Sequence, residues 1–243
     1  SASAFKIGLR HIDYLQLLFI ATATTLVFLF FVLLLQNKLK LITKVSLKDF
    51  GHSALLGFLN PFLYYTVLFI AYTLLPAQVA QPLNFVWPIT LVLLSAVILK
   101  QKLQLKSLFA LFISFIGVIL IAAEGNITNM NFSNPLGVIL ALGSSVIWAL
   151  FWLYNVKDQR DEIVKLFLNF LFAFIFITVL TILFSTLRIK SVYGILSGIY
   201  IGIFEMGVTY VLWMTALKLS RTTAQVSNLI YLAPFLSLFI IHF

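Results

Sequence analysis

Apolar residues occur along this chain in eight long runs separated by short polar or basic links. A helical crossing of the hydrocarbon core takes about 20 apolar residues. The runs lack the period-two alternation of strands, so they predict α-helices that span a membrane. We therefore expect an all-α, polytopic membrane protein with a single membrane domain. The runs cover approximately 13–36, 52–73, 76–99, 105–123, 135–156, 164–187, 193–217 and 222–243.

The third run opens with a segment that is unusually polar for a membrane crossing. Residues 75–88 read Leu-Pro-Ala-Gln-Val-Ala-Gln-Pro-Leu-Asn-Phe-Val-Trp-Pro. Because lipid offers no hydrogen bonds, the amide side chains and the backbone groups freed by proline need partners inside the protein or in a water-filled cavity. A segment of similar character covers 220–234. Two such segments at corresponding places in two halves are typical of a transporter's binding site.

Short identities also relate the two halves of the chain. Gly57, Tyr65 and Ala71 recur 145 residues later as Gly202, Tyr210 and Ala216. The runs that begin at 52 and 193 are five crossings apart, so they enter the membrane from opposite sides. We therefore predict an inverted-repeat helical bundle, with a first repeat at 1–123, an outer loop at 124–134 and a second repeat at 135–243.

Basic residues lie in the links and favour one side of the membrane. Of the 16 lysines and arginines, twelve fall in one set of alternate links and four in the other. The positive-inside rule then places the links after residues 36, 100, 157 and 218 in the cytoplasm, and both ends of the chain outside. The link 36–50 mixes lysines with apolar residues, so it either lies along the interface or forms a solvated loop.

Composition narrows the function further. The 243 residues are 62% hydrophobic and 9% charged, with a net charge of +9 and no cysteine. The basic residues form no continuous face, so the lipid bilayer, and not nucleic acid, is the expected partner. The sequence shows no His/Asp/Glu cluster and no glycine-rich phosphate loop. It therefore predicts no metal, no cofactor and no catalytic constellation, and we do not expect an enzyme.

Several motifs together resemble the drug/metabolite transporter superfamily, specifically its EamA-type members. The resemblance implies ten helices in two inverted five-helix halves, arranged around a central cavity for a small-molecule substrate. It also implies that residues 1–9 are the tail of the first helix, that the eight runs are helices two to nine, and that the tenth is absent. The matching pieces are Leu75–Ala80 with Trp87 and Pro88, Phe115–Ile121, Gly137–Trp152, Thr209–Leu217, and Ala233 with Pro234.

Glu205 is the one acidic residue near the middle of a predicted crossing. Placing a carboxylate at the bilayer centre costs about 2.5–3.5 kcal/mol on insertion scales, and protonation relieves that cost. Glu205 is therefore either a proton-coupling group or partner of a substrate ammonium, or a protonated side chain that bonds a neighbouring helix. Asn60 lies 145 residues earlier, at the corresponding position of the first repeat. It either lines the cavity or packs between helices.

Other polar and aromatic side chains inside the runs are candidates for the cavity. Gln81, Asn84 and Trp87 are three residues apart, which places them on one face of a helix. These side chains either line a site for an apolar or aromatic metabolite or belong to ordinary core packing. The remaining candidates are Tyr64, Trp148, Tyr210, Trp213, Asn228 and Tyr231, and kinks or hinges are predicted at Pro61, Pro82, Pro88 and Pro234.

Together these observations predict a secondary transporter in a bacterial inner (cytoplasmic) membrane. We expect it to export a small organic metabolite, amino acid or amine-like and including aromatic ones, by alternating access. Transport is either coupled to a proton gradient through Glu205 or proceeds as uncoupled facilitated diffusion. The alternative class is a non-transporting membrane protein, such as a lipid-modifying enzyme or an assembly scaffold. The sequence fixes neither the substrate nor the oligomeric state.

Overall fold

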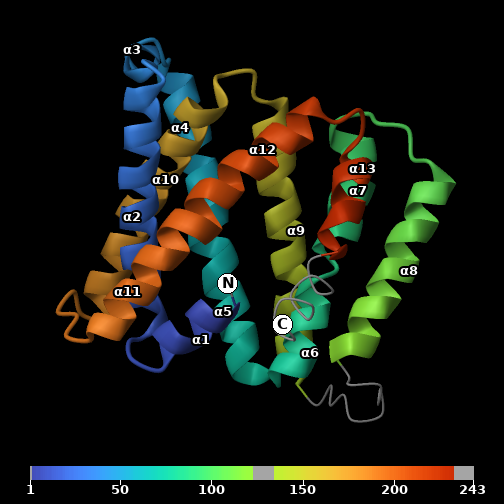
Figure 1. The fold of residues 1–243 in the computed structure, drawn as a ribbon, viewed down its shortest axis with the longest axis horizontal. Helices are drawn as coiled ribbons and strands as arrows, with labels where there is room; N and C mark the ends of the chain where they lie inside the picture. The colour runs from blue at the N-terminus through green and yellow to red at the C-terminus, as the bar shows by residue number, and fades with distance from the viewer. Residues whose placement is uncertain (1, 123–133, 233–243) are drawn as a thin grey trace, which may run out of the picture. The chain divides into compact units, whose positions relative to one another are not determined.

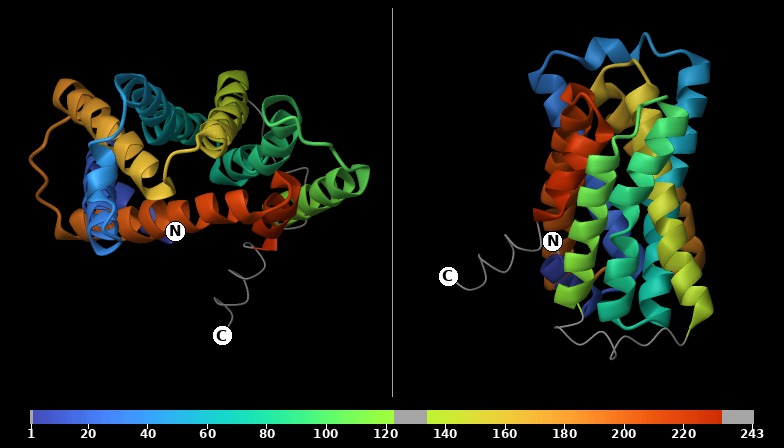
Figure 2. Two further views of the ribbon diagram at one scale, coloured as in Figure 1. Left: turned by 90° about the horizontal axis from the view of Figure 1, so that it is seen from above. Right: turned by 90° about the vertical axis from the view of Figure 1, so that its right-hand side faces the viewer.

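The computed structural model describes residues 2–122 and 134–232, which form helices joined by short links (Figures 1 and 2). Within these ranges there is no β-strand, so the all-α prediction is confirmed. The helices are α1 (Ala2–Leu9), α2 (Tyr14–Leu35), α3 (Leu39–Ile42), α4 (Leu47–Gly57), η1 (Phe58–Leu63), α5 (Tyr64–Leu74), α6 (Ala77–Asn84), α7 (Trp87–Ile98), α8 (Leu105–Ala122), α9 (Pro135–Lys157), α10 (Glu162–Phe184), α11 (Val192–Tyr200), η3 (Ile201–Val208), α12 (Thr209–Leu219) and α13 (Thr223–Ile230).

Six stretches of the described chain are long and apolar enough to cross a membrane, which confirms the polytopic class. Helix α8 coincides with the run 105–123. Of the run 222–243, the structure describes α13 and three further residues; the rest lies outside the described residues, as does most of the predicted outer loop 124–134. The six stretches are Tyr14–Leu35, Leu47–Leu74, Val79–Ile98, Pro135–Lys157, Glu162–Phe184 and Val192–Leu219.

Helix α4 begins five residues before the apolar run that predicted it. Ser46 and Asp49 form a capping box, in which the Ser46 hydroxyl accepts from the Asp49 N–H and the Asp49 carboxylate accepts from the Ser46 N–H. This reciprocal cap satisfies backbone donors that a helix start leaves without partners. The helix can therefore start among polar residues, where hydrophobic periodicity gives no signal.

Two of the long stretches depart from the regular α-helix: the first is kinked at η1, and the second contains the π-helical segment η3. Shifted by 145 residues, η1 corresponds to 203–208, which are the last six residues of η3. Inside η1, Asn60 has non-helical backbone angles (φ −154°, ψ 128°). The two predicted repeats therefore depart from the α-helix at the same place, and such departures are frequent at functional sites.

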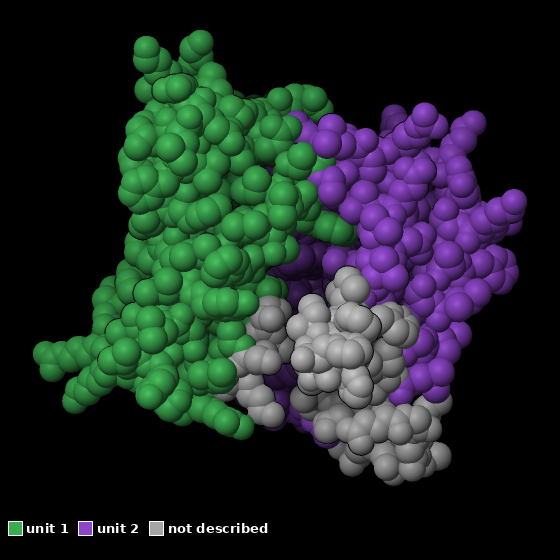
Figure 3. Space-filling model, in the orientation of Figure 1, with its two compact units in different colours: residues 1–62, 158–215 green, residues 63–157, 216–243 purple. Residues whose placement is uncertain are grey.

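Contacts divide the chain into two compact units, which Figure 3 shows in different colours. Unit 1 comprises residues 1–62 and 158–215, and unit 2 comprises residues 63–157 and 216–243. Each unit contains helices from both predicted repeats, so units and repeats divide the chain differently. The repeat assignment, 1–123 and 135–243, stays a prediction.

In unit 1, α2 packs against α10, η3 and α11, while α4 packs against α10. Leu17, Leu29 and Leu33 of α2 are fully buried. The last residue of α4, Gly57, touches the backbone of α10: a Cβ there would overlap the carbonyl oxygen of Asn169. A small residue is needed for helices to approach this closely inside a membrane protein.

The two ends of unit 1 are tied by different polar contacts. At one end, the Asp13 carboxylate caps α2 and also accepts from the Ser185 hydroxyl at 2.6 Å. At the other end, Lys38 Nζ lies 2.7 Å from Asp161 Oδ2. The links 36–46 and 158–161 thus share one end of unit 1, an arrangement that alternate links require.

Unit 2 is built around α9, which packs against α5, α6 and α7, and α13 packs against α7 and α8. Ala141, Ala149 and Trp152 of α9 are fully buried. Near the start of α9, Gly137 lies directly against Leu75. Small residues thus let α9 approach several neighbours at once.

Candidate functional site

A buried hydrogen-bond network joins three helices of unit 2. Asn84, the last residue of α6, donates from Nδ2 to the Ser144 hydroxyl of α9 at 3.1 Å. The Tyr64 hydroxyl, at the start of α5, lies 3.3 Å from Asn84 Nδ2 and 3.4 Å from Asn84 Oδ1. All three residues are buried. Sequence analysis predicted Tyr64 and Asn84 as site residues, and the structure brings them into direct contact.

Aromatic rings surround this network. The ring of Trp148 lies 4.7 Å from that of Tyr64 and 5.7 Å from that of Trp87, centroid to centroid. Trp152, one turn further along α9, follows at 5.8 Å from Trp148. Rings at these separations attract one another and present both apolar faces and polar edges. The cluster can therefore hold an apolar, aromatic or cationic group beside amide and hydroxyl groups.

A helix break positions this cluster. The predicted crossing 76–99 is divided into α6 and α7, because Pro88 has no N–H and its ring clashes with the carbonyl four residues earlier, that of Asn84. The Tyr231 hydroxyl, next to the end of α13, donates to the Phe85 carbonyl in the break at 3.2 Å. Beyond the break, the Thr90 and Ser145 hydroxyls pair at 3.1 Å and fasten α7 to α9. Tyr231 was also a predicted site residue, and its hydroxyl supports the broken segment.

A second polar pair lies inside unit 1. The Tyr210 hydroxyl of α12 donates to Asn60 Oδ1 of η1 at 3.0 Å, and both residues are buried. The Phe170 ring packs edge-on against Tyr210 at 5.3 Å. Asn60 Nδ2 has no hydrogen-bond acceptor among the described residues. Buried amide donors usually have a partner, so this unpaired donor is held in the protein interior at a cost in free energy.

Glu205 lies in η3 and is half-buried. Among the described residues, it makes no hydrogen bond or ion pair. The segment that carries it is packed tightly on α2: the Thr25 hydroxyl lies 2.9 Å from the Gly202 carbonyl oxygen. A carboxylate within a membrane crossing and without a fixed partner is a functional-site candidate by default.

The other predicted residues are placed less centrally. Of the three residues predicted to share one helix face, Gln81 and Asn84 lie in α6, whereas Trp87 begins α7 beyond a two-residue break. Gln81 is exposed and takes no part in the network. Trp213 and Asn228 are half-buried, and Asn228 Oδ1 has no partner in the described part of the chain. Pro234 lies outside the described residues.

The sequence analysis missed one residue of the unit 2 cluster, Ser144, which it did not assign to the site. The Ser144 hydroxyl accepts a hydrogen bond from the Asn84 amide, and the Trp152 ring extends the row of aromatic rings beyond Trp148. The available signal was spacing: Ser144, Trp148 and Trp152 are four apart on α9, so they follow one another along one helix face.

Charged side chains of unit 1 gather at the end that holds α3. Arg160 donates to both carboxylate oxygens of Asp158, to the Asp49 carbonyl at 3.2 Å and to the Ser53 hydroxyl at 3.0 Å. Burial of Asp158 by itself raises the pKa of that carboxyl, but the bonds from Arg160 and the charge of Lys165 outweigh it. The net pKa of Asp158 is lowered. This cluster ties the start of α10 to α4.

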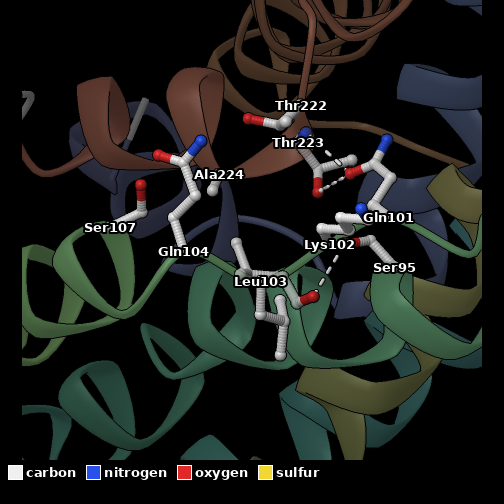
Figure 4. A pocket seen from close by; sticks show the side chains of 10 residues that line it. Ser95, Gln101, Lys102, Leu103, Gln104, Ser107, Thr222, Thr223 and Ala224 are labelled. Atoms are coloured by element: carbon white, nitrogen blue, oxygen red, sulfur yellow. Dashed lines mark hydrogen bonds between the residues drawn. The ribbon is translucent and has the colours of Figure 1, made fainter.

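A small polar pocket lies at the ends of α7, α8 and α13 in unit 2 (Figure 4). There, Gln101 Oε1 accepts from the Thr223 N–H at 3.1 Å and from its hydroxyl at 3.0 Å (Figure 4). Gln101 thus caps the start of α13. Thr222, the residue directly before α13, makes no side-chain hydrogen bond to the helix start. The pocket has room for about one water molecule, too little for a metabolite. Among the described residues, no group of three His, Cys, Asp or Glu side chains could hold a metal ion.

Comparison with known proteins adds a family and a fold. The model of the EamA-like transporter family matches residues 1–123 and 135–243. A solved structure described as "Crystal structure of protein" aligns with a TM-score of 0.80 at 19% identity, covering 99% of this chain and 81% of that chain. At this identity the likeness concerns the fold alone.

Two curated relatives carry the same kind of description. The uncharacterized transporter YvbV of Bacillus subtilis is 27% identical over 185 residues, covering 74% of this chain and 59% of the relative. An uncharacterized transporter of Clostridium kluyveri is 26% identical over 200 residues, covering 78% and 62%. The chain thus spans less than two thirds of these relatives' length. Because the family model covers both long segments of the sequence, the chain belongs to the EamA-like transporter family of the drug/metabolite transporter superfamily.

Proposed function

We propose that this protein is a secondary transporter that exports a small organic metabolite across a bacterial inner membrane by alternating access. The expected substrate is amino acid or amine-like, with an apolar or aromatic body. Family membership supports transport, and the apolar helices support a bilayer location. The substrate class, the direction and the mechanism are proposals.

One observation carries the substrate class: the Tyr64–Asn84–Ser144 network lies beside the rings of Trp87 and Trp148. The two Tyr64–Asn84 contacts, at 3.3 and 3.4 Å, are longer than the usual 2.7–3.2 Å of a strong hydrogen bond. A substrate that carries amino, carboxyl or carbonyl groups can therefore replace them at small cost. The tryptophan faces would take its apolar body or its ammonium group.

Alternating access is supported by the breaks in the helices. In the first predicted repeat one crossing is kinked at η1 and the next is divided at 85–86, and in the second repeat one crossing contains the π-helical η3. Discontinuous helices at corresponding places are typical of transporters that move one repeat against the other. The excess of basic residues in alternate links supports placing the links after 36, 100, 157 and 218 in the cytoplasm.

Glu205 is the proposed proton-coupling residue. Its carboxyl lies in a membrane crossing, is half-buried and has no fixed partner among the described residues. A group in this setting can take up a proton on one side and release it on the other. Coupling through Glu205 predicts that flux depends on pH.

Flux into proteoliposomes tests the transport proposal. The purified protein should accumulate a labelled amino acid or amine by counterflow. Ser144→Ala, which removes the Asn84 acceptor, should raise the KM for flux. The matched control is Ser95→Ala, because the Ser95 hydroxyl bonds only within its own helix, to Val92 O at 2.7 Å. Absence of flux for every amino acid and amine tested would favour the alternative, a lipid-modifying enzyme or an assembly scaffold.

A further inference from the structure

The π-helical segment η3 lies against α2 along its length. A Cβ on Gly202 would lie 2.5 Å from the carbonyl oxygen of Ala21, and a Cβ on Gly207 would lie 2.8 Å from Cδ1 of Phe28. These separations admit no side chain, so the backbone of η3 lies directly against the α2 backbone at Gly202 and against the Phe28 ring at Gly207. A small movement of η3 therefore has to be accommodated at this contact.

Thr25 of α2 places a hydroxyl at the centre of the contact. Its Oγ1 lies 2.9 Å from the Gly202 carbonyl oxygen and 2.8 Å from the Ala21 carbonyl oxygen, one turn back in its own helix. A hydroxyl has one hydrogen to donate, so the two carbonyls compete for it. Thr25 is fully buried, which excludes water as a third partner. When the bond across the helices breaks, the Ala21 carbonyl keeps the donor satisfied, so the cost is that of one net hydrogen bond and not that of an unpaired buried hydroxyl.

A second threonine hydroxyl, that of Thr209, contacts η3 at the carbonyl of Phe204. The Phe204 carbonyl accepts the backbone N–H of Thr209, five residues ahead as a π-helix requires, and also the Thr209 hydroxyl at 2.6 Å. Glu205 directly follows this carbonyl. If η3 changed from π-helix to α-helix, its register would shift by one residue and the side chains beyond would turn by about 100°. The form of η3 therefore decides where the Glu205 carboxyl lies.

We propose that Thr25 is a positioning residue for Glu205. Its hydroxyl holds η3 in the π-helical form, and transfer of that hydroxyl from the Gly202 carbonyl to the Ala21 carbonyl accompanies movement of η3 during transport. This inference rests on the proposed role of Glu205 in proton coupling. Thr22, on the same helix, offers a matched control, because it is also fully buried and its Oγ1 has no partner among the described residues.

The test compares Thr25→Val, Thr25→Ser and Thr22→Val in proteoliposomes. Loss of one net hydrogen bond changes an equilibrium about fivefold, or about 0.7 pH unit. Thr25→Val should therefore move the midpoint of the pH–flux profile by about that amount. Thr25→Ser keeps the hydroxyl and should restore the wild-type midpoint, while Thr22→Val should leave it unchanged. Should Thr25→Val fail to fold, Thr25→Ala removes the same hydroxyl with less steric demand.

Hydrogen–deuterium exchange gives a readout that does not need transport. The amides of Ile201–Val208 should exchange faster in Thr25→Val than in wild type or Thr22→Val. If exchange and midpoint in Thr25→Val match Thr22→Val, the positioning role is overturned, while the coupling role of Glu205 stands. If Glu205→Gln keeps the wild-type pH dependence, the coupling proposal fails instead. In that case, faster exchange in Thr25→Val would still support the proposal that Thr25 holds η3 in the π-helical form. It would overturn the proposal that this contact affects proton coupling.

Discussion

Replacing Gly137 with alanine should destabilise the protein, whereas the same replacement of Gly143 should not. Both glycines lie in α9. A Cβ on Gly137 would lie 2.7 Å from Cγ of Leu75 and 3.0 Å from Cβ of Leu74, but around Gly143 there is no heavy atom within 4 Å. Leu75 is buried and packs with Val79 and Ala80, so it has little room to move.

The size of the effect follows from these distances. Ordinary van der Waals contact begins at 3.4 Å, so the new methyl group on Gly137 would overlap Leu75 by about 0.7 Å. Overpacking of this kind costs about 1–3 kcal/mol. Alanine is better than glycine inside a helix by about 0.5–1 kcal/mol, which offsets part of that cost. The middle of the two ranges gives a net loss of about 1.2 kcal/mol for Gly137→Ala, with an upper limit of about 2.5 kcal/mol, and the gain for Gly143→Ala is about 0.5–1 kcal/mol.

Thermal unfolding in one detergent, followed by tryptophan fluorescence, measures both variants. At this chain length 1 kcal/mol corresponds to about 2–4 °C in Tm. We expect Gly137→Ala to lower Tm by about 2–5 °C and Gly143→Ala to raise it by about 1–4 °C. A Gly137→Ala protein as stable as wild type would refute the close approach of α9 to Leu75. Equal shifts of the same sign in both variants would refute the argument from space.

Three further predictions concern polar groups. Tyr210→Phe removes the hydroxyl that donates to Asn60 Oδ1 and should lower the free energy of unfolding by about 1–3 kcal/mol. Adding Asn60→Leu to the same chain should recover much of that loss, and no recovery would contradict the pairing. Glu205→Gln should abolish the pH dependence of flux, measured in proteoliposomes between pH 5 and pH 8, and unchanged dependence would rule out coupling there. Because the folded-state pKa of Asp158 is lowered, its stabilising effect is present above its ordinary value of about 3.9 and is lost as pH falls through the lower value. Asp158→Asn should therefore be less stable than wild type at pH 7 and lose less Tm between pH 5 and pH 3; parallel Tm curves would show that Asp158 does not contribute.

The crossings could be predicted because each consists of a long apolar run, and length together with hydrophobicity is enough to identify a membrane helix. Local departures were harder to predict. The early start of α4 depends on two short polar side chains, Ser46 and Asp49, that lie outside any apolar period. Proline did indicate breaks near Pro61 and Pro88, but the π-helical form of η3 has no proline inside it and depends on packing against α2.

The candidate site could be predicted by residue type but not by pairing. Polar side chains inside apolar runs pointed to Asn60, Tyr64, Asn84 and Tyr210. Their partners lie far away along the chain: Ser144 is 60 residues from Asn84, and Tyr210 is 150 from Asn60. Nothing local encodes such contacts, since they follow from how helices pack. Gln81 shows the converse, because it lies three residues before Asn84 in α6, yet it is exposed while Asn84 is buried.

The interleaving of sequence in the compact units has a consequence for biosynthesis. Unit 1 begins with α2 and α4, yet the helix that packs against both of them, α10, starts about 105 residues after α4 ends. At about 5–20 residues per second, a ribosome needs about 5–20 s to make that interval. During that time Phe19 and Phe30 of α2 lack the α10 rings that they contact in the folded protein, Phe174 and Phe167. The first segment of unit 1 therefore lacks its packing partner α10 while most of unit 2 is synthesised.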